Sequence, residues 1–324
     1  MGRRIAALEG RRRGRDTAAA WLQVGMARAY HFDEPARCRT RGALRPKAHL
    51  LLLKSFKRFN TCNLLHTRKG KAVVEFSRHK QDFDRDGYVV VRKFLDAGDF
   101  RNLTQNLDRY IRDVVPGLPH EAAFYHDRSR PETLKQMQHM AANEPYFEAY
   151  RKHPRWRALA EALLGESVDV HDPEWFNKPP GTDHPTPAHQ DNYYFCLKPA
   201  NVVTIWLAID PVGEENGCLR YVPGSHLRGI RPHSSSRVLG FSQGISDYGD
   251  DDRASEVKIL LDPGDTVVHH GNTIHRAEAN RTSDRNRRAF AMVMRGQSCE
   301  RDEDAFERNR IALEAQHKEM GLKV

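Results

Sequence analysis

The part of the sequence after Gly165 consists of short β-rich runs separated by turns. Valine, isoleucine, threonine and aromatic residues fill the runs, and proline, glycine, aspartate or asparagine separate them. The runs cover residues 168–171, 201–210, 219–222, 257–261, 266–270 and 288–294. The sequence contains no βαβ alternation and no glycine-rich phosphate loop. We therefore predict an antiparallel core of the double-stranded β-helix type, also called a jelly-roll or cupin-like core.

Helical patterns flank this core. After a turn at residues 82–87 and a strand at residues 88–91, Asp96 is placed to begin a helix whose apolar residues recur every three or four positions until Pro116. Two further helical patterns cover residues 146–152 and 156–164, and a charged one covers residues 302–319. The predicted fold class is therefore mostly β with flanking helices.

The net charge of +9 is concentrated in the first 75 residues. They hold 18 lysines and arginines against 5 acidic residues, which leaves 34 of the 52 basic and 38 of the 43 acidic residues for the rest. We predict that residues 1–75 are a basic leader outside the fold: a transit peptide, a binding tail, or translated sequence before a later start such as Met26. Residues 76–300 form the jelly-roll domain and residues 301–324 a C-terminal helix. The slightly acidic body argues against a nucleic-acid partner.

Five scattered cysteines without a CxxC pair suit a reducing compartment, so we predict a cytoplasmic location. No apolar run approaches the roughly 20 residues of a membrane-spanning helix. The sequence makes no prediction about the oligomeric state.

His189 and Asp191 form the most informative pair. Side chains two residues apart on an extended strand leave the same face, so both would point into one space. One imidazole and one carboxylate are two thirds of a 2-His-1-carboxylate site, which holds non-haem Fe(II) and leaves other positions open. His275 is the best third ligand, because a late strand of a jelly roll returns beside an early one. HxD pairs are common by chance, so the pair alone is weak evidence.

A basic cluster follows His275. Arg285, Arg287 and Arg288 run into the apolar strand at residues 289–294. An arginine that opens a strand next to a metal could bind a carboxylate with its planar guanidinium. For Arg285 an ordinary surface position is the better interpretation.

From about residue 76 to residue 297 the sequence resembles the phytanoyl-CoA dioxygenase (PhyH) family of Fe(II)/2-oxoglutarate-dependent oxygenases. Four blocks occur in the family's order: DGYVVV with FLD, HQD, a block from Trp206 to His226 that includes NGCL and VPGSH, and a block from Gly264 to Arg287 that includes HHG. Four ordered blocks are much more specific than any single motif.

The resemblance implies roles for individual residues. His189, Asp191 and His275 match the iron ligands, and Arg287 matches the arginine that binds the distal carboxylate of 2-oxoglutarate. One extra residue separates His275 from Arg287 compared with the family, so Arg288 stays an alternative. Only one of these two arginines can face inward, since neighbours on a strand point in opposite directions.

Three further residues resemble co-substrate or pocket residues of relatives: Lys135, Asn177 and Trp206. An exposed lysine on a helix is an equal interpretation for Lys135, and core packing is the better one for Trp206. Residues that we consider as pocket walls are His171, Glu174, Trp175, His184, Tyr193, Tyr194, Arg220 and His233.

The resemblance implies an enzyme that binds Fe(II), 2-oxoglutarate and O2 and hydroxylates an unactivated C–H bond of a small organic substrate. Relatives that halogenate carbon lack the carboxylate ligand, so Asp191 favours hydroxylation. Two alternatives remain: a cupin-like metal-dependent isomerase or hydrolase, and a non-catalytic jelly roll that binds a ligand. The polar and aromatic candidate walls suit a small polar or anionic metabolite better than a long acyl chain, and the acidic body does not favour a CoA ester.

Overall fold

The structure is a computed structural model that describes residues 75–238 and 241–319. The basic leader, apart from residue 75, and the last five residues lie outside the described residues, so the division of the chain into leader, domain and C-terminal helix remains a prediction. Within the described part, no helix is both long and apolar enough to cross a membrane.

Helices precede most of the strands, and 3-10 turns connect some of them. The α-helices are α3 (Lys80–Asp86), α4 (Ala97–Asp113), α5 (Met140–Asn143), α6 (Pro145–Tyr150), α7 (Pro154–Leu164), α8 (Asn192–Phe195), α9 (Asp250–Ala254) and α10 (Glu303–Glu319). The 3-10 turns are η1 (Val115–Gly117), η2 (Pro131–Thr133) and η3 (Ser225–Arg228).

The strands form one large and three smaller antiparallel sheets. Those of the large sheet, in spatial order, are β1 (Tyr88–Val91), β13 (Thr266–His270), β8 (Val202–Ala208), β15 (Arg287–Gly296), β5 (Glu174–Lys178), β3 (Leu134–Met137) and β2 (Ala123–Tyr125), and β4 (Val168–Val170) also pairs with β15. The facing sheet has the order β12 (Val257–Ile259), β9 (Leu219–Tyr221), β14 (His275–Ala277) and β6 (Thr186–His189). Two short pairs complete the fold: β10 (His233–Val238) with β11 (Phe241–Ile245), and β7 (Leu197–Lys198) with β16 (Glu300–Arg301).

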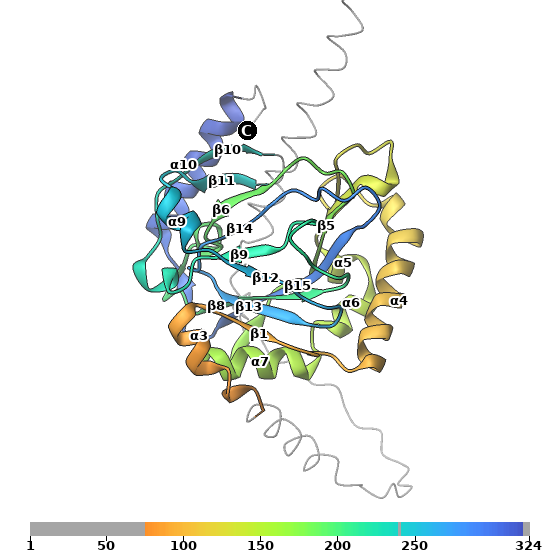
Figure 1. Cartoon of the computed structure of the whole chain (residues 1–324), viewed down its shortest axis with the longest axis horizontal. Helices are drawn as coiled ribbons and strands as arrows, with labels where there is room; N and C mark the ends of the chain where they lie inside the picture. Colours follow the sequence, from red (N-terminus) through yellow and green to blue (C-terminus); the bar gives the residue numbers. More distant parts are fainter. Residues whose placement is uncertain (1–74, 239–240, 320–324) are drawn as a thin grey trace, which may run out of the picture.

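Alternation along β15 divides the large sheet into two faces. Phe290 points outward into a helical layer, where it lies 5.7 Å from Trp156 of α7 and 6.1 Å from Phe147 of α6, measured between ring centroids. The small side chains of Ala289 and Ala291 point the other way, against the four-stranded sheet. Figure 1 shows α7 below the strands and α4 along one side. Helices α4, α6 and α7 therefore cover the outer face, and the space between the two sheets is left for a site.

The predicted fold class is confirmed: antiparallel sheets with flanking helices form a double-stranded β-helix. Asp96 begins α4 as predicted, because its side chain accepts hydrogen bonds from the backbone N–H groups of Gly98 and Asp99 at 2.8 Å. The predicted turn at residues 82–87 is wrong in part. Residues 82–86 belong to helix α3, and only Gly87, with a left-handed φ of 80°, makes the turn that ends it.

Candidate active site

The two candidate histidine ligands lie opposite each other on neighbouring strands. β14 pairs with β6 in antiparallel register, and His275 is the direct partner of His189. This confirms that a late strand returns beside the early one. Asp191 does not continue the strand as we predicted: it has helical backbone angles (φ −58°, ψ −38°) immediately before α8. The helical turn brings its carboxylate back toward the imidazoles, so the three side chains still converge.

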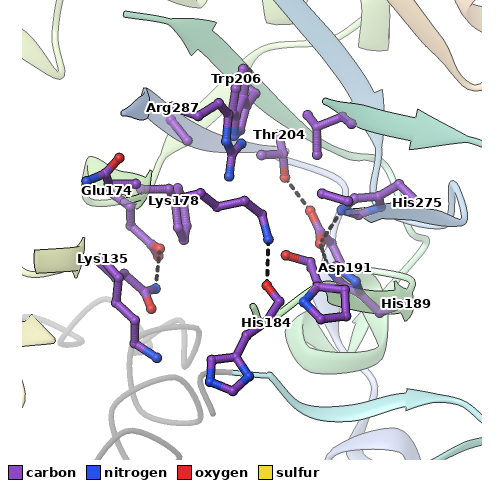
Figure 2. A pocket seen from close by; sticks show the side chains of 18 of the residues that line it. Lys135, Glu174, Lys178, His184, His189, Asp191, Thr204, Trp206, His275 and Arg287 are labelled. Carbon is purple, nitrogen blue, oxygen red and sulfur yellow. Dashed lines mark hydrogen bonds and ion pairs between the residues drawn. The ribbon is translucent and has the colours of Figure 1, made fainter. Parts of the chain in front are cut away.

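The ligand atoms of this triad lie within 4.8 Å of one another. Oδ1 of Asp191 is 3.4 Å from Nε2 of His189 and 3.5 Å from Nε2 of His275. Both histidines are buried, at 4% and 5% exposure. Figure 2 shows the three side chains grouped at one end of the cavity.

Backbone carbonyls fix the orientation of both imidazoles. Nδ1 of His189 lies 2.8 Å from the carbonyl oxygen of Pro187, and Nδ1 of His275 lies 3.0 Å from that of Thr273. A carbonyl can only accept, so Nδ1 carries the proton and Nε2 presents its lone pair to the centre of the triad. Burial lowers the pKa of His275 well below its usual value, and this also favours the neutral ring.

The second oxygen of Asp191 is held by other side chains. Oδ2 accepts a hydrogen bond from Thr204 Oγ1 at 2.6 Å and lies 3.0 Å from Nε2 of His269. The Tyr221 hydroxyl in turn lies 2.8 Å from Nδ1 of His269. Because an ionised carboxylate only accepts, His269 donates from Nε2 and its Nδ1 accepts from Tyr221. Oδ1 is therefore left for a metal. Burial opposes ionisation of Asp191, but the nearby histidines outweigh it and hold the pKa well below its usual value.

This donor set fits Fe(II). Two neutral imidazole nitrogens and one carboxylate oxygen are the facial set of non-haem iron oxygenases, and their ligand atoms converge on one side of a cavity. The cavity lies between the two sheets, and its lining includes all three triad residues.

Arg287 and Arg288 point in opposite directions, as expected for neighbours on a strand. Arg287 is 5% exposed, lines the cavity, and has its guanidinium carbon 5.1 Å from the ring centroid of Trp206. Its Nε has no hydrogen-bond partner in the described part of the chain. Burial lowers its pKa to about 10. Arg288 instead binds Asp210 on the outside, with Nη2 2.7 Å from Oδ1. Of the two, only Arg287 faces the cavity that contains the triad.

The other predicted co-substrate residues also line the cavity. Lys135 is buried on strand β3, so the alternative of an exposed helical lysine is wrong. Asn177 donates from its amide to the backbone oxygen of Leu134 at 3.1 Å. Trp206 lies both in the cavity lining and in the apolar core between the sheets.

The predicted wall residues divide into two groups. Those that line the cavity are Glu174, His184 and Tyr194. Those that lie outside the lining found among the described residues are His171, Trp175, Tyr193, Arg220 and His233. Trp175, for example, points into the helix-covered core, because it alternates with Glu174 along β5.

Sequence reasoning gave no role to four residues that contribute to the site: Lys178, Thr204, Tyr221 and His269. Lys178 directly follows Asn177 and pairs with Arg287 across β5 and β15. Thr204 lies two residues before Trp206 and so shares its face of β8. The roles of these residues can be inferred only once the register of the strands is known.

A jelly roll with a His-Asp-His triad and a buried arginine between its sheets defines a class, the Fe(II)/2-oxoglutarate oxygenases. Residues 83–289 match the family described as "Phytanoyl-CoA dioxygenase (PhyH)". The chain belongs to this family, whose members use iron and 2-oxoglutarate.

Individual relatives agree with this assignment. "Phytanoyl-CoA dioxygenase, peroxisomal" of Rattus norvegicus is 28% identical over 214 residues, which cover 62% of this chain and 62% of the relative. The chain thus matches less than two thirds of the length of this curated relative. Among solved structures, EvdO2 from Micromonospora carbonacea var. aurantiaca complexed with 2-oxoglutarate is 26% identical, with a TM-score of 0.55 over 69% of this chain and 91% of EvdO2. The epimerase SnoN from nogalamycin biosynthesis is 25% identical, with a TM-score of 0.52 over 71% of this chain and 85% of SnoN.

Proposed function

We propose that the protein is an Fe(II)/2-oxoglutarate-dependent dioxygenase that hydroxylates an unactivated C–H bond of a small organic substrate. In this reaction 2-oxoglutarate becomes succinate and CO2, and O2 is the oxidant. The supporting observation is a metal-binding triad with both Nε2 atoms and one carboxylate oxygen converging, at a cavity that also contains the buried guanidinium of Arg287.

Bound iron and 2-oxoglutarate supply the oxidising chemistry that side chains lack. His189, Asp191 and His275 hold the metal on one side, so that the remaining positions face the cavity. Arg287, at the cavity wall, binds the distal carboxylate and thereby orients the keto acid. Trp206 stacks against that guanidinium and keeps it in place. The buried lining excludes water, which strengthens each of these electrostatic contacts.

Hydroxylation is one of several outcomes that this fold supports. SnoN is described as an epimerase, and its structure is similar to this one. Asp191 fills the third ligand position and so argues against halogenation. Product analysis by mass spectrometry separates the remaining possibilities, since a hydroxylase adds one oxygen atom to its substrate and an epimerase adds none.

One anaerobic titration separates this proposal from its rivals. Fe(II) is added first and 2-oxoglutarate second, and the visible charge-transfer band of the keto-acid–iron chelate is followed. The oxygenase develops the band. A cupin-like isomerase or hydrolase binds the metal without developing it, and a non-catalytic ligand-binding jelly roll does neither.

Removal of a ligand is the matched genetic test. His189→Ala or Asp191→Ala should lower succinate formation to the background without enzyme, because two protein ligands do not hold the metal in position. The circular dichroism spectrum should be unchanged, since both side chains face the cavity. Full activity in either variant would contradict the assignment.

The partner of this enzyme, in our proposal, is a small molecule rather than a nucleic acid or a membrane. We also retain the cytoplasm as the predicted location, on the cysteine pattern alone. Expression of the full chain with a C-terminal fluorescent tag tests this location.

A further inference from the structure

The cavity contains a second buried cation beside Arg287. Lys178 is 6% exposed, and it is the direct strand partner of Arg287 across β5 and β15. Partners in an antiparallel pair share a face, so both side chains enter the same space. Figure 2 shows the Lys178 side chain reaching across the cavity. Its Nζ donates to the backbone oxygen of His184 at 3.0 Å.

The carboxylate that acts on Lys178 in this pair of cations is Glu278, which is already ion-paired with Arg276. Within the residues that the structure describes, neither Lys178 nor Arg287 forms an ion pair with a carboxylate. Like charges opposite each other on neighbouring strands destabilise a sheet, and burial of unpaired charge adds to that cost. Burial and the charge of Arg287 lower the pKa of Lys178 well below its usual value, and the opposing effect of Glu278 does not cancel them. Such a cost is typical of a site that binds an anion.

The co-substrate does not account for all of this positive charge. In the proposed function, one of its two carboxylates would bind the metal and the other would bind Arg287. Lys135 lines the same cavity as a third buried cation and resembles a lysine that reaches the co-substrate in relatives. Among the cavity residues, only Glu174 and Asp191 are carboxylates, and Asp191 is a metal ligand. With Fe(II) bound and both lysines protonated, the positive charge around the cavity would exceed the negative charge of Asp191, Glu174 and the co-substrate by one.

The position of Lys178 indicates which ligand would supply the additional negative charge. Its ammonium is bound to His184, an exposed residue at the rim of the cavity, rather than to a group near Trp206. The His184 ring stacks on that of His126 with 5.7 Å between centroids. Both histidines line the cavity with Lys178, so the ammonium lies on the side of the cavity that these two rings form. Burial lowers the pKa of His126 to about 4, and the nearby charges of Lys135 and Lys178 add to this effect.

The geometry points to Lys178 as the residue that binds a carboxylate of the primary substrate, which makes the substrate a small organic carboxylic acid. This inference rests on the proposed function and names its substrate class. The ammonium replaces its hydrogen bond to His184 with a charge-assisted one to the incoming carboxylate. A CoA thioester does not fit this role, because its phosphates are separated from the acyl group by a long arm and Lys178 is buried inside the cavity.

The experiment compares acids with their neutral analogues. Succinate release from 2-oxoglutarate by the Fe(II)-loaded enzyme is measured with a panel of aliphatic and aromatic monocarboxylic acids, their primary amides and their CoA thioesters. The variants are Lys178→Met, the charge-retaining Lys178→Arg, and Lys198→Met, an exposed lysine on β7 that serves as the control. The affinity for 2-oxoglutarate is measured separately by the anaerobic chelate band.

The wild type and Lys198→Met should be stimulated by acids about 10- to 100-fold more than by the matching amides, which is the size of a charge-assisted hydrogen bond. Lys178→Met should lose this preference, with its affinity for 2-oxoglutarate within about threefold of wild type, and Lys178→Arg should retain part of it. The inference is overturned if amides or thioesters stimulate the wild type as well as acids do, or if no acid stimulates it. It is also overturned if Lys178→Met weakens the binding of 2-oxoglutarate as strongly as Arg287→Met does, since Lys178 would then bind the co-substrate and not the primary substrate. Absence of the chelate band in the wild type is a different result, because it contradicts the proposed function itself.

Discussion

The partly buried arginines of the four-stranded sheet and the buried Arg287 of the large sheet have opposite surroundings. On the outer face of the four-stranded sheet, Arg276 binds Glu256 through Nη2 at 2.8 Å and Glu278 through Nη1 at 2.6 Å, and Arg220 approaches Glu256 at 3.4 Å. On the inner face of the large sheet, Arg287 has no carboxylate partner in the described part of the chain. At Arg276 the ion pairs outweigh burial and raise the pKa of the guanidinium. At Arg287 burial is the dominant effect and lowers the pKa.

The difference separates residues that maintain the fold from residues that await a ligand. Arg276 follows the metal ligand His275 on the same short strand, yet its charge is fully paired within the protein. Arg287 is as buried as the core, and its unpaired charge contributes nothing favourable to folding. A buried cation without a counter-ion is therefore a better marker of the site than a buried cation as such.

Stability measurements give the largest expected contrast. Arg276→Met should lower the free energy of unfolding by about 3–5 kcal/mol, because it leaves the buried carboxylate of Glu256 without its main partner. Arg287→Met should change it by less than about 1 kcal/mol, or raise it, since it removes an unpaired charge. Urea unfolding of the metal-free proteins measures both values, and equal losses would contradict the comparison. Arg285→Met is the control, because Arg285 forms an exposed ion pair with Glu215. Its free energy of unfolding should stay within about 1 kcal/mol of wild type.

Affinity for the co-substrate should show the reverse order. Arg287→Met should weaken the binding of 2-oxoglutarate by about 2–4 kcal/mol, or roughly 30- to 1,000-fold in the dissociation constant, because it removes one partner of a buried ion pair in the complex. Its neighbour Arg288, bound to Asp210 on the outside, provides the matched control. Arg288→Met should leave the dissociation constant within about twofold, as measured by the chelate band. A larger effect at Arg288 would exchange the roles of the two residues.

Much of this division was predictable from the sequence. The short β-rich runs predicted the fold class, the HxD pair and a late strand predicted the three ligands, and the ordered blocks supported both. Strand alternation predicted the opposed directions of Arg287 and Arg288. What was not predictable depends on register or on local backbone. Lys178 points to a function only because β5 places it opposite Arg287. The sequence around Lys135 is compatible with a helix, but this residue lies on strand β3.

Helix boundaries near short polar runs were equally unpredictable. Residues 82–86 have a composition typical of a turn, but helix α3 extends through them, with Phe83 buried and Gly87 ending it. Tertiary packing outweighs local propensity there. Asp191 was misplaced for a related reason, since nothing in the HxD pattern states where the strand ends.

His269 and Tyr221 provide a test of positioning rather than of charge. His269→Phe should weaken Fe(II) binding about 10- to 100-fold, because Oδ2 of Asp191 loses one of the hydrogen bonds that orient it. Tyr221→Phe should have a smaller effect of the same sign, because it removes only the hydroxyl that binds His269 and keeps the ring that stacks on His275. The readouts are the metal dissociation constant and the energy of the chelate band, which a purely structural role would leave unchanged. Thr204 continues to donate to Oδ2, so neither variant should abolish binding.

The pH dependence of co-substrate binding gives the smallest expected effect, and it concerns Lys135. Burial lowers its pKa to about 7, so the ammonium that would attract an anion is present below that pH and is lost above it. If Lys135 contacts 2-oxoglutarate, the dissociation constant should therefore rise with pH above 7 by up to about tenfold per pH unit, since one proton is bound with each ligand. Lys135→Met should bind less tightly at low pH and show a flat profile over the same range, with the wild-type profile of Arg288→Met as the control. A wild-type dissociation constant that falls as pH rises would show that Lys135 is not an anion-binding residue, and Arg287 and Lys178 would then be the cations that attract ligands into the cavity.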